Sequence, residues 1–146
     1  MLSVYVAGAS LEIGRARKVV AALEAAARTL PIEVVSTWID AIEAAGTANE
    51  GLTPAARREA ARTCLEEVRE ADVFVLLVPH NPSGIGCGVE LGYAMALRDE
   101  NPLRAPVLIA SGRTERTIFA ALADEEHASD EAAVKAVVRM AGEAAG

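Results

Sequence analysis

One apolar run, Val73 to Val78, constrains the fold of this chain more than any other segment. An unbroken apolar strand is typical of a parallel sheet that helices cover on both faces. A glycine-rich segment, Asn81 to Gly92, follows it and runs into an apolar helical stretch, Leu91 to Leu97. A buried strand, a glycine-rich turn and a helix start together form a phosphate- or sugar-binding corner in open α/β sheets.

The rest of the chain alternates between strand and helix signals. Strands are expected at residues 4–7, 32–35, 73–78 and 106–110. Helices are expected after Ser10, which would cap the first, after Thr53-Pro54, and at residues 117–123 and 129–144. This alternation predicts one α/β domain over residues 1–146, with a Rossmann-like (flavodoxin-like) parallel sheet of four to five strands and helices on both faces.

Hydrophobic spacing predicts which helix faces are buried. The residues expected to be buried are Ala61, Cys64, Leu65 and Val68 in the helix after Thr53, and Val134, Val137, Val138 and Ala141 in the last helix. A polar and glycine-containing stretch follows Asp40 and continues through Leu52. Asp124 to Glu126 is expected to be a solvated acidic turn.

Charge and cysteine content exclude several classes of function. The net charge of −7 argues against a nucleic acid polymer as partner, because such binding needs a basic surface. Cys64 and Cys87 form no CxxC pair, and His80 and His127 are isolated, so neither a metal nor another cofactor is expected. With no signal-like start and no membrane-length apolar run, we expect a soluble, cytoplasmic protein without membrane contact.

The carboxyl ends of parallel strands meet in one crevice, which is where ligands bind in such sheets. The loops that should converge there are 8–10, 36–40, 79–90 and 110–113. Trp38 could stack on a base, or could equally cover the core. Asp40 could bond the edge of that base. Arg15 could reach a phosphate or be a solvated charge. Ser111, Arg113 and Arg116 could form a small positive cluster, with solvent exposure as the default reading.

Glu90 is the strongest catalytic candidate, because it is expected in the first turn of the helix that follows the glycines. A carboxylate there should stay ionised at neutral pH, which suits a nucleophile better than an acid. A surface carboxylate that merely offsets the helix dipole is the alternative. Asp72, which opens the apolar strand, is expected to anchor the start of that strand by hydrogen bonds.

Four segments together resemble the nucleoside 2-deoxyribosyltransferase family and its relatives, the 2′-deoxynucleoside 5′-phosphate N-hydrolases. They are Val4-Tyr5-Val6-Ala7-Gly8, Ala71-Asp72-Val73, the run Gly86-Cys87-Gly88-Val89-Glu90-Leu91-Gly92-Tyr93-Ala94, and Thr117-Ile118-Phe119. The resemblance covers nearly the whole chain in order.

The resemblance implies that Glu90 attacks the anomeric carbon of a deoxyribose while Tyr5 holds its carboxylate. Transfer to a second base would make a transferase, and transfer to water a hydrolase. Ser83 and Thr117 are the nearest counterparts of the family's phosphate-binding residues, and a homodimer with a shared active site is implied. The substrate-binding residues expected in all are Gly8, Ser10, Trp38, Asp40, Cys64, Ser83, Gly84, Gly86, Gly88, Ser111 and Thr117.

The chain departs from the family pattern at two positions. Cys64 stands where the family has an aspartate that serves proton transfer, and Gly84 stands where it has a polar turn residue, with Ser83 one place earlier. A nucleotide-binding protein that has lost turnover is therefore an alternative. A Rossmann-like enzyme of unrelated chemistry is a third, although Gly8-Ala9-Ser10 does not match a dinucleotide-binding Gly-x-Gly-x-x-Gly.

Overall fold

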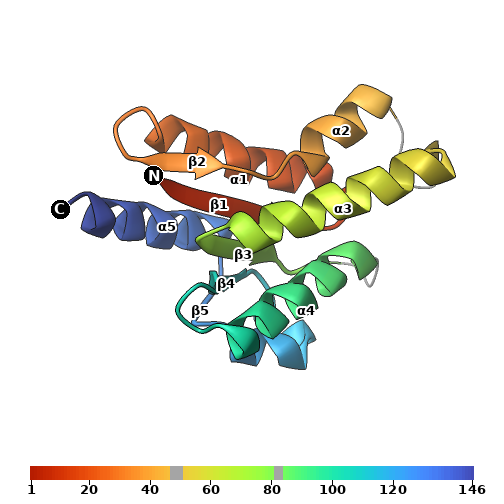
Figure 1. Cartoon of the computed structure of the whole chain (residues 1–146). Coiled ribbons are helices and arrows are strands. Elements are labelled where there is room, and N and C mark those ends of the chain that lie inside the picture. The colour runs from red at the N-terminus through yellow and green to blue at the C-terminus, as the bar shows by residue number, and fades with distance from the viewer. Residues whose placement is uncertain (47–50, 81–83) are drawn as a thin grey trace.

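The structure, a computed structural model, describes residues 1–46, 51–80 and 84–146. Its centre is a five-stranded sheet in the order β2-β1-β3-β4-β5 (Figure 1). The strands are β1 (Leu2–Ala7), β2 (Ile32–Val34), β3 (Val73–Leu77), β4 (Val107–Ser111) and β5 (Glu125–His127). Neighbouring strands all pair in parallel. The predicted α/β class is confirmed, and the strand order is that of flavodoxin-like folds.

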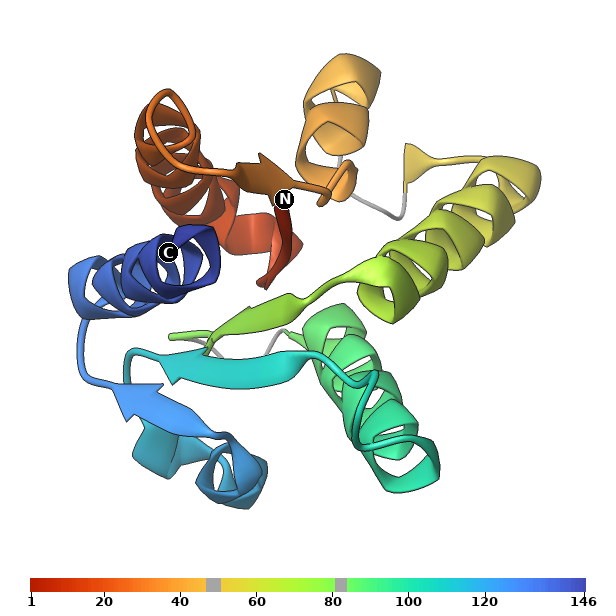
Figure 2. The ribbon, with the colours of Figure 1, turned by 60° about the vertical axis from the view of Figure 1, so that its left-hand side comes forward.

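Helices cover both faces of this sheet, as predicted (Figure 2). One face packs against α1 (Ile13–Ala26) and α5 (Asp130–Ala145). The other packs against α3 (Pro54–Glu70) and α4 (Ile85–Glu100). A shorter helix, α2 (Trp38–Ala45), contacts α1 and α3. None of the helices in the described ranges is long and apolar enough to cross a membrane.

Side-chain alternation along β1 separates two cores. Val4 and Val6 point into the core beside α1 and α5, whereas Tyr5 points into the core beside α3 and α4. Phe74 of β3 is the partner of Tyr5 in the sheet register, and their rings stack with centroids 5.7 Å apart. The sheet therefore presents an aromatic pair to the α3/α4 face.

Two helices begin where their capping signals predict. Thr53 accepts a hydrogen bond from the Ala56 amide at 3.2 Å, and Pro54 is the first residue of α3. Ser129 accepts one from the Ala132 amide at 3.2 Å at the start of α5. Short-range capping is thus a reliable guide at these two positions, because it depends only on adjacent residues.

The predicted cap at the first helix is wrong. Ser10 makes no capping bond and lies inside a 3-10 turn, η1 (Ser10–Glu12), that precedes α1. The stretch after Asp40 begins as helix, because α2 continues to Ala45 and ends at Gly46, whose φ is +62°. Glycine adopts this left-handed conformation without the steric cost of a Cβ.

The predicted acidic turn is a strand. β5 pairs with β4 in parallel at the sheet edge, and Asp124 accepts a hydrogen bond from the Leu108 amide at 2.7 Å. The stretch expected to be a helix at 117–123 is a 3-10 helix, η4 (Ile118–Leu122), preceded by another, η3 (Thr114–Arg116).

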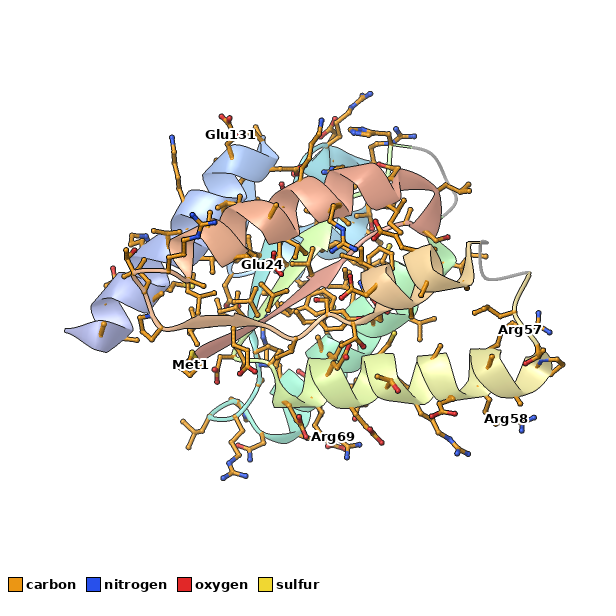
Figure 3. All side chains as sticks on the ribbon, turned by 90° about the horizontal axis from the view of Figure 1, so that it is seen from above. Met1, Glu24, Arg57, Arg58, Arg69 and Glu131 are labelled. Carbon is orange, nitrogen blue, oxygen red and sulfur yellow. The ribbon has the colours of Figure 1, made fainter. Side chains whose placement is uncertain are left out.

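Burial along α3 is less than its spacing predicts. Val68 is fully buried, but Cys64 is only partly buried and Ala61 is exposed. The amino-terminal half of α3 extends beyond the sheet, and Arg57 and Arg58 project from it into solvent (Figure 3). Apolar spacing alone does not reveal how far a helix overhangs its sheet.

Candidate active site

Tyr5 and Glu90, 85 residues apart in sequence, meet on the α3/α4 face of the sheet. The Tyr5 hydroxyl donates a hydrogen bond to Glu90 Oε1 at 2.9 Å. Tyr5 is fully buried, whereas Glu90 on α4 is only partly buried. The contact joins β1 to α4, the helix that follows β3, and β1 and β3 are the neighbouring strands at which ligands bind in this topology.

The helix that carries Glu90 starts earlier than expected. Because α4 begins at Ile85, Glu90 lies in its second turn, and Gly86 and Gly88 are helical rather than part of a loop. A Cβ on Gly86 or Gly88 would meet nothing within 4 Å. These two glycines therefore leave part of the outer surface of α4 without side chains. Because both are helical, their amides do not form a ligand-binding loop near Glu90.

Gly84 has a different reason to be glycine. A Cβ there would lie 2.4 Å from the Pro79 side chain and 2.8 Å from the Cys87 sulfur. The position is thus closed to a larger residue by packing at the amino end of α4. Gly8 has ordinary space, because a Cβ there would lie 3.6 Å from its nearest neighbour, the Leu77 side chain.

Glu90 holds its proton more tightly than the sequence predicts. Burial raises the pKa of its carboxyl to about 7, and hydrogen bonds from Tyr5 and Cys64 offset only part of that effect. The expectation of full ionisation at neutral pH is wrong, because it assumed an exposed first-turn carboxylate. A carboxyl that titrates near neutral pH is able to act as acid, base or nucleophile.

Cys64 completes the group from a third element, α3. Its side chain packs against the core that contains Tyr5, and its thiol is one of the groups that lower the pKa of Glu90. Burial raises the pKa of the thiol to about 11, and the pKa of the Tyr5 hydroxyl also lies well above its usual range because of burial and the nearby Glu90. Both groups are therefore neutral hydrogen-bond donors to the carboxylate at neutral pH.

Glu67 and Thr37 are site residues that the sequence reasoning missed. The Thr37 amide donates to Glu67 Oε2 at 3.2 Å, and the Thr37 hydroxyl donates to Oε1. Burial raises the pKa of the Glu67 carboxyl, and the negative charge of Glu70 adds to the effect. The available signal was spacing, because Glu67 follows Cys64 by three residues on one helix face.

Trp38 and Asp40 do not face Glu90 as a pair. Trp38 Nε1 donates to the Val6 carbonyl at 2.8 Å, and the indole packs against both cores. This contact favours the core-covering alternative for Trp38. Asp40 forms an ion pair with Arg17 at 2.7 Å on the surface, where 75% of its side chain is exposed.

Ser111 and Arg15 belong to the opposite face of the sheet. Arg15 Nε donates to Asp130 Oδ2 at 2.8 Å, and the fully buried Ser111 hydroxyl donates to Asp130 Oδ1 at 2.6 Å. Arg15 also donates to the Val78 carbonyl at 2.6 Å. Arg15 is therefore not a solvated charge, since only 14% of its side chain is exposed, and a phosphate contact by Arg15 stays a prediction. The Ser111 hydroxyl is bonded to a structural partner.

The other residues that were expected near a substrate phosphate make local contacts. Thr117 accepts a hydrogen bond from the Phe119 amide at 3.3 Å and starts η4. Arg113 and Arg116 are both exposed, which agrees with the default reading for them, and Arg113 pairs with Glu115 while Arg116 donates to the His80 carbonyl. Ser83 lies outside the described residues.

Asp72 anchors the start of β3, as predicted. Its Oδ2 accepts hydrogen bonds from the amide and the hydroxyl of Ser3, both at 2.9 Å. In the described ranges, no group of three histidine, cysteine or acidic side chains is arranged to hold a metal ion.

The fold and site together define a flavodoxin-like α/β protein in which a partly buried carboxyl on α4, with a pKa of about 7, contacts β1. A scan against protein-family models and searches of curated proteins and of solved structures find no match to the chain. The chemistry of the site therefore carries the functional argument.

Proposed function

We propose that this protein cleaves or exchanges the N-glycosidic bond of a deoxynucleoside or its 5′-monophosphate, with Glu90 as the nucleophile. One observation carries the proposal: Tyr5, Cys64 and Glu90 converge from β1, α3 and α4 at the strand pair where this fold binds ligands. The resemblance of the sequence requires the same three positions to share one site.

The chemistry suits a carboxylate in this environment. Cleavage of an N-glycosidic bond leaves positive charge on the anomeric carbon, and an ionised Glu90 would stabilise that charge strongly where water is excluded. The positive charge that develops on the anomeric carbon also lowers the pKa of Glu90. This opposes the rise in that pKa that burial causes. Tyr5 would orient the carboxylate through its 2.9 Å hydrogen bond.

The reaction would then proceed in two displacements. A Glu90 oxygen bonds to the anomeric carbon as the bond to the base breaks, and the base leaves with the bonding electron pair and gains a proton. Water or a second base next attacks the anomeric carbon and releases Glu90. The proposed chemistry requires no metal or organic cofactor.

A second copy of the chain is the proposed partner. The outer surface of α4 exposes 82% of Ile85 and 59% of Val89 beside the bare Gly88, and η4 exposes 81% of Ile118 next to Thr117. Small and apolar residues on one helix surface allow close helix packing. A homodimer through α4 would cover this surface next to the site and bring a second Thr117 towards it.

The alternative function is nucleotide binding without turnover. It is favoured by Cys64, because a neutral thiol with a pKa of about 11 replaces the carboxyl that the family pattern places there. A nucleotide that raises the melting temperature but yields no free base would support this alternative. Recovery of base release in Cys64→Asp would then identify the missing carboxyl as the cause.

The test of the proposed function is chromatographic detection of free base. The panel contains deoxynucleosides, ribonucleosides and their 5′-monophosphates, with a second free base in half of the reactions. We expect base release that is lost in Glu90→Ala and Glu90→Gln but kept in Glu100→Gln, an exposed carboxylate at the far end of α4. Exchange only with added base would indicate a transferase, and no release from any substrate would refute the proposal.

A further inference from the structure

A second carboxyl, that of Glu67, lies on the helix that carries Cys64. Glu67 follows Cys64 by three residues on α3, and Thr37 holds both of its oxygens through its amide and hydroxyl. The side chain is partly buried, so it is neither a freely solvated charge nor closed to a ligand. Its position is set by contacts 30 residues away in sequence.

Glu67 also shares the electrostatic environment of the site. Its negative charge adds to the rise in the pKa of both Cys64 and Glu90. Cys64, one turn before Glu67 on α3, packs against the core that contains Tyr5. The titratable groups around it are Cys64 and Glu70 on α3 and Glu90 on α4.

The proposed reaction needs a proton donor that the other three groups supply poorly. Glu90 is used as the nucleophile. The pKa of Cys64 is about 11, and that of Tyr5 lies even further above its usual range, so both are weak acids at neutral pH. A carboxyl whose pKa burial has raised is a much better match to the proton transfer.

We infer that Glu67 is the general acid that protonates the departing base, in the place that Cys64 leaves without a carboxyl. This inference rests on the proposed N-glycosidic cleavage. As the bond between the anomeric carbon and the base nitrogen breaks, its electron pair goes to the base, and the Glu67 proton goes to a base nitrogen. Glu90 forms the new bond to carbon, and the Glu67 carboxylate then takes a proton from the attacking water.

The two carboxyls can divide these roles when substrate binds. Neighbouring carboxyls resist double ionisation, so the pair retains one proton to a higher pH than an isolated carboxyl would. Positive charge that develops at the anomeric carbon favours the ionised form of Glu90, and the remaining proton then belongs to Glu67. This division matches the acid and nucleophile of retaining glycosidases.

A leaving-group comparison tests the assignment. The substrates are 2′-deoxyguanosine and 7-methyl-2′-deoxyguanosine, or their 5′-monophosphates; the methylated base already carries the positive charge that protonation would supply. We expect Glu67→Gln to slow release of guanine by about 10²-fold or more and to leave release of 7-methylguanine within about threefold of wild type. If the panel selects pyrimidines, deoxyuridine and its 5-fluoro derivative replace the pair.

The control is Glu66→Gln, an exposed carboxylate on the same helix that faces away from the site. Equal losses for both leaving groups in Glu67→Gln, or losses no larger than those of Glu66→Gln, would overturn the assignment while the proposed function stands. Absence of base release by the wild-type protein would overturn both together. Melting temperatures of both variants identify a loss that is caused by unfolding.

The pH dependence provides a second readout that a purely structural role would not change. The Thr37 hydroxyl lowers the pKa of Glu67 by hydrogen bonding to its ionised form. Thr37→Val removes that bond, so the basic limb of the kcat/KM profile should move to higher pH. An unchanged basic limb in Thr37→Val would contradict the role of Glu67 as the acid.

Discussion

The carboxyl groups of Asp130 and Glu90, on opposite faces of the sheet, have different partners and opposite pKa shifts. On the α1/α5 face, Asp130 is paired with Arg15, and the hydrogen bond from Arg15 is the main reason that the pKa of Asp130 is lowered. On the α3/α4 face, none of the cations in the described ranges pairs with Glu90, and burial raises its pKa to about 7. Hence the first carboxylate contributes to stability, and the second is available for chemistry.

The hydrogen-bond partners explain the difference. The Arg15 guanidinium on α1 donates hydrogen bonds to Asp130 on α5 and to the carbonyls of Val78 and Ser111. One cation therefore supplies hydrogen-bond donors to three acceptors on different segments. Around Glu90 the donors are the neutral Tyr5 hydroxyl and Cys64 thiol, which orient the carboxylate without neutralising it. Orientation without neutralisation is what a reactive carboxylate requires.

The largest expected effect is on catalysis by the α3/α4 face. Glu90→Gln keeps the size of the side chain but removes the nucleophilic oxygen, so base release should fall on the order of 10⁴-fold or more. Steady-state rates measured by chromatography test this, with Glu100→Gln as the control. A variant that retains more than a tenth of the wild-type rate would remove Glu90 from the mechanism.

The same substitution should change how stability depends on pH. Because the folded-state pKa of Glu90 lies above its ordinary value, the wild-type protein loses stability as pH rises from about 4.5 to about 7, by about 3 kcal/mol. Urea unfolding at pH 5 and pH 8 should show this loss in wild type and a smaller one in Glu90→Gln. Parallel pH profiles for the two proteins would show that Glu90 is not buried as described.

Substitution on the α1/α5 face should lower the stability of the protein and leave its activity unchanged. Asp130→Ala leaves Arg15 and Ser111 without their shared acceptor, and it should lower the free energy of unfolding by about 2 kcal/mol. The contribution of Asp130 is present above its unfolded pKa and disappears as pH falls through its lowered folded pKa. The exposed neighbour variant, Glu131→Ala, should change stability by less than about 0.5 kcal/mol.

Base release at temperatures where both variants are folded completes this comparison. Asp130→Ala should retain the wild-type rate, since Asp130 contacts neither Tyr5 nor Glu90. A strong loss of activity in the folded Asp130→Ala protein would mean that the two faces are coupled.

Self-association should depend on the α3/α4 face alone. Val89→Lys places a charge on the exposed surface of α4 and should raise the dimer Kd by about tenfold or more, as measured by analytical ultracentrifugation. The matched control is Ala22→Lys, which places the same charge on the exposed side of α1. A wild-type protein that remains monomeric at high concentration would refute the dimer.

The smallest expected effect on the rate of base release is that of Cys64→Ser, which tests whether Cys64 or Glu67 is the proton donor. Cys64→Ser preserves a neutral donor near Glu90, so the rate of base release should change by less than about threefold. A loss in Cys64→Ser as large as that of Glu67→Gln would indicate that the thiol itself takes part in proton transfer.

Much of the fold could be predicted because its signals are local. The apolar run at Val73, the caps at Thr53 and Ser129 and the helical spacing after each are read from neighbouring residues. β5 escaped prediction because its acidic residues have weak strand propensity and owe their conformation to pairing with β4. The start of α2 was missed for a similar reason, since Trp38 is held by the Val6 carbonyl.

The candidate site was predicted in part. The glycine-rich turn and the helix after it point to Glu90, and the resemblance adds Tyr5 and Cys64, but Glu67 and Thr37 lie outside both signals. Their bond joins residues 30 positions apart, and no local pattern specifies such a contact. Ser111 and Arg15 were placed with the substrate because both follow or adjoin strand ends, although their side chains face Asp130 on the opposite side of the sheet.

By itself, the sequence determined the α/β class, the parallel sheet and the positions of two helix starts, because hydrophobic periodicity and capping act over a few residues. Only the tertiary structure decided which carboxylate is neutralised by an arginine and which is left with neutral donors. That decision sets the pKa of Glu90 through burial, and burial depends on packing between β1, α3 and α4 rather than on the residues beside Glu90 in the chain.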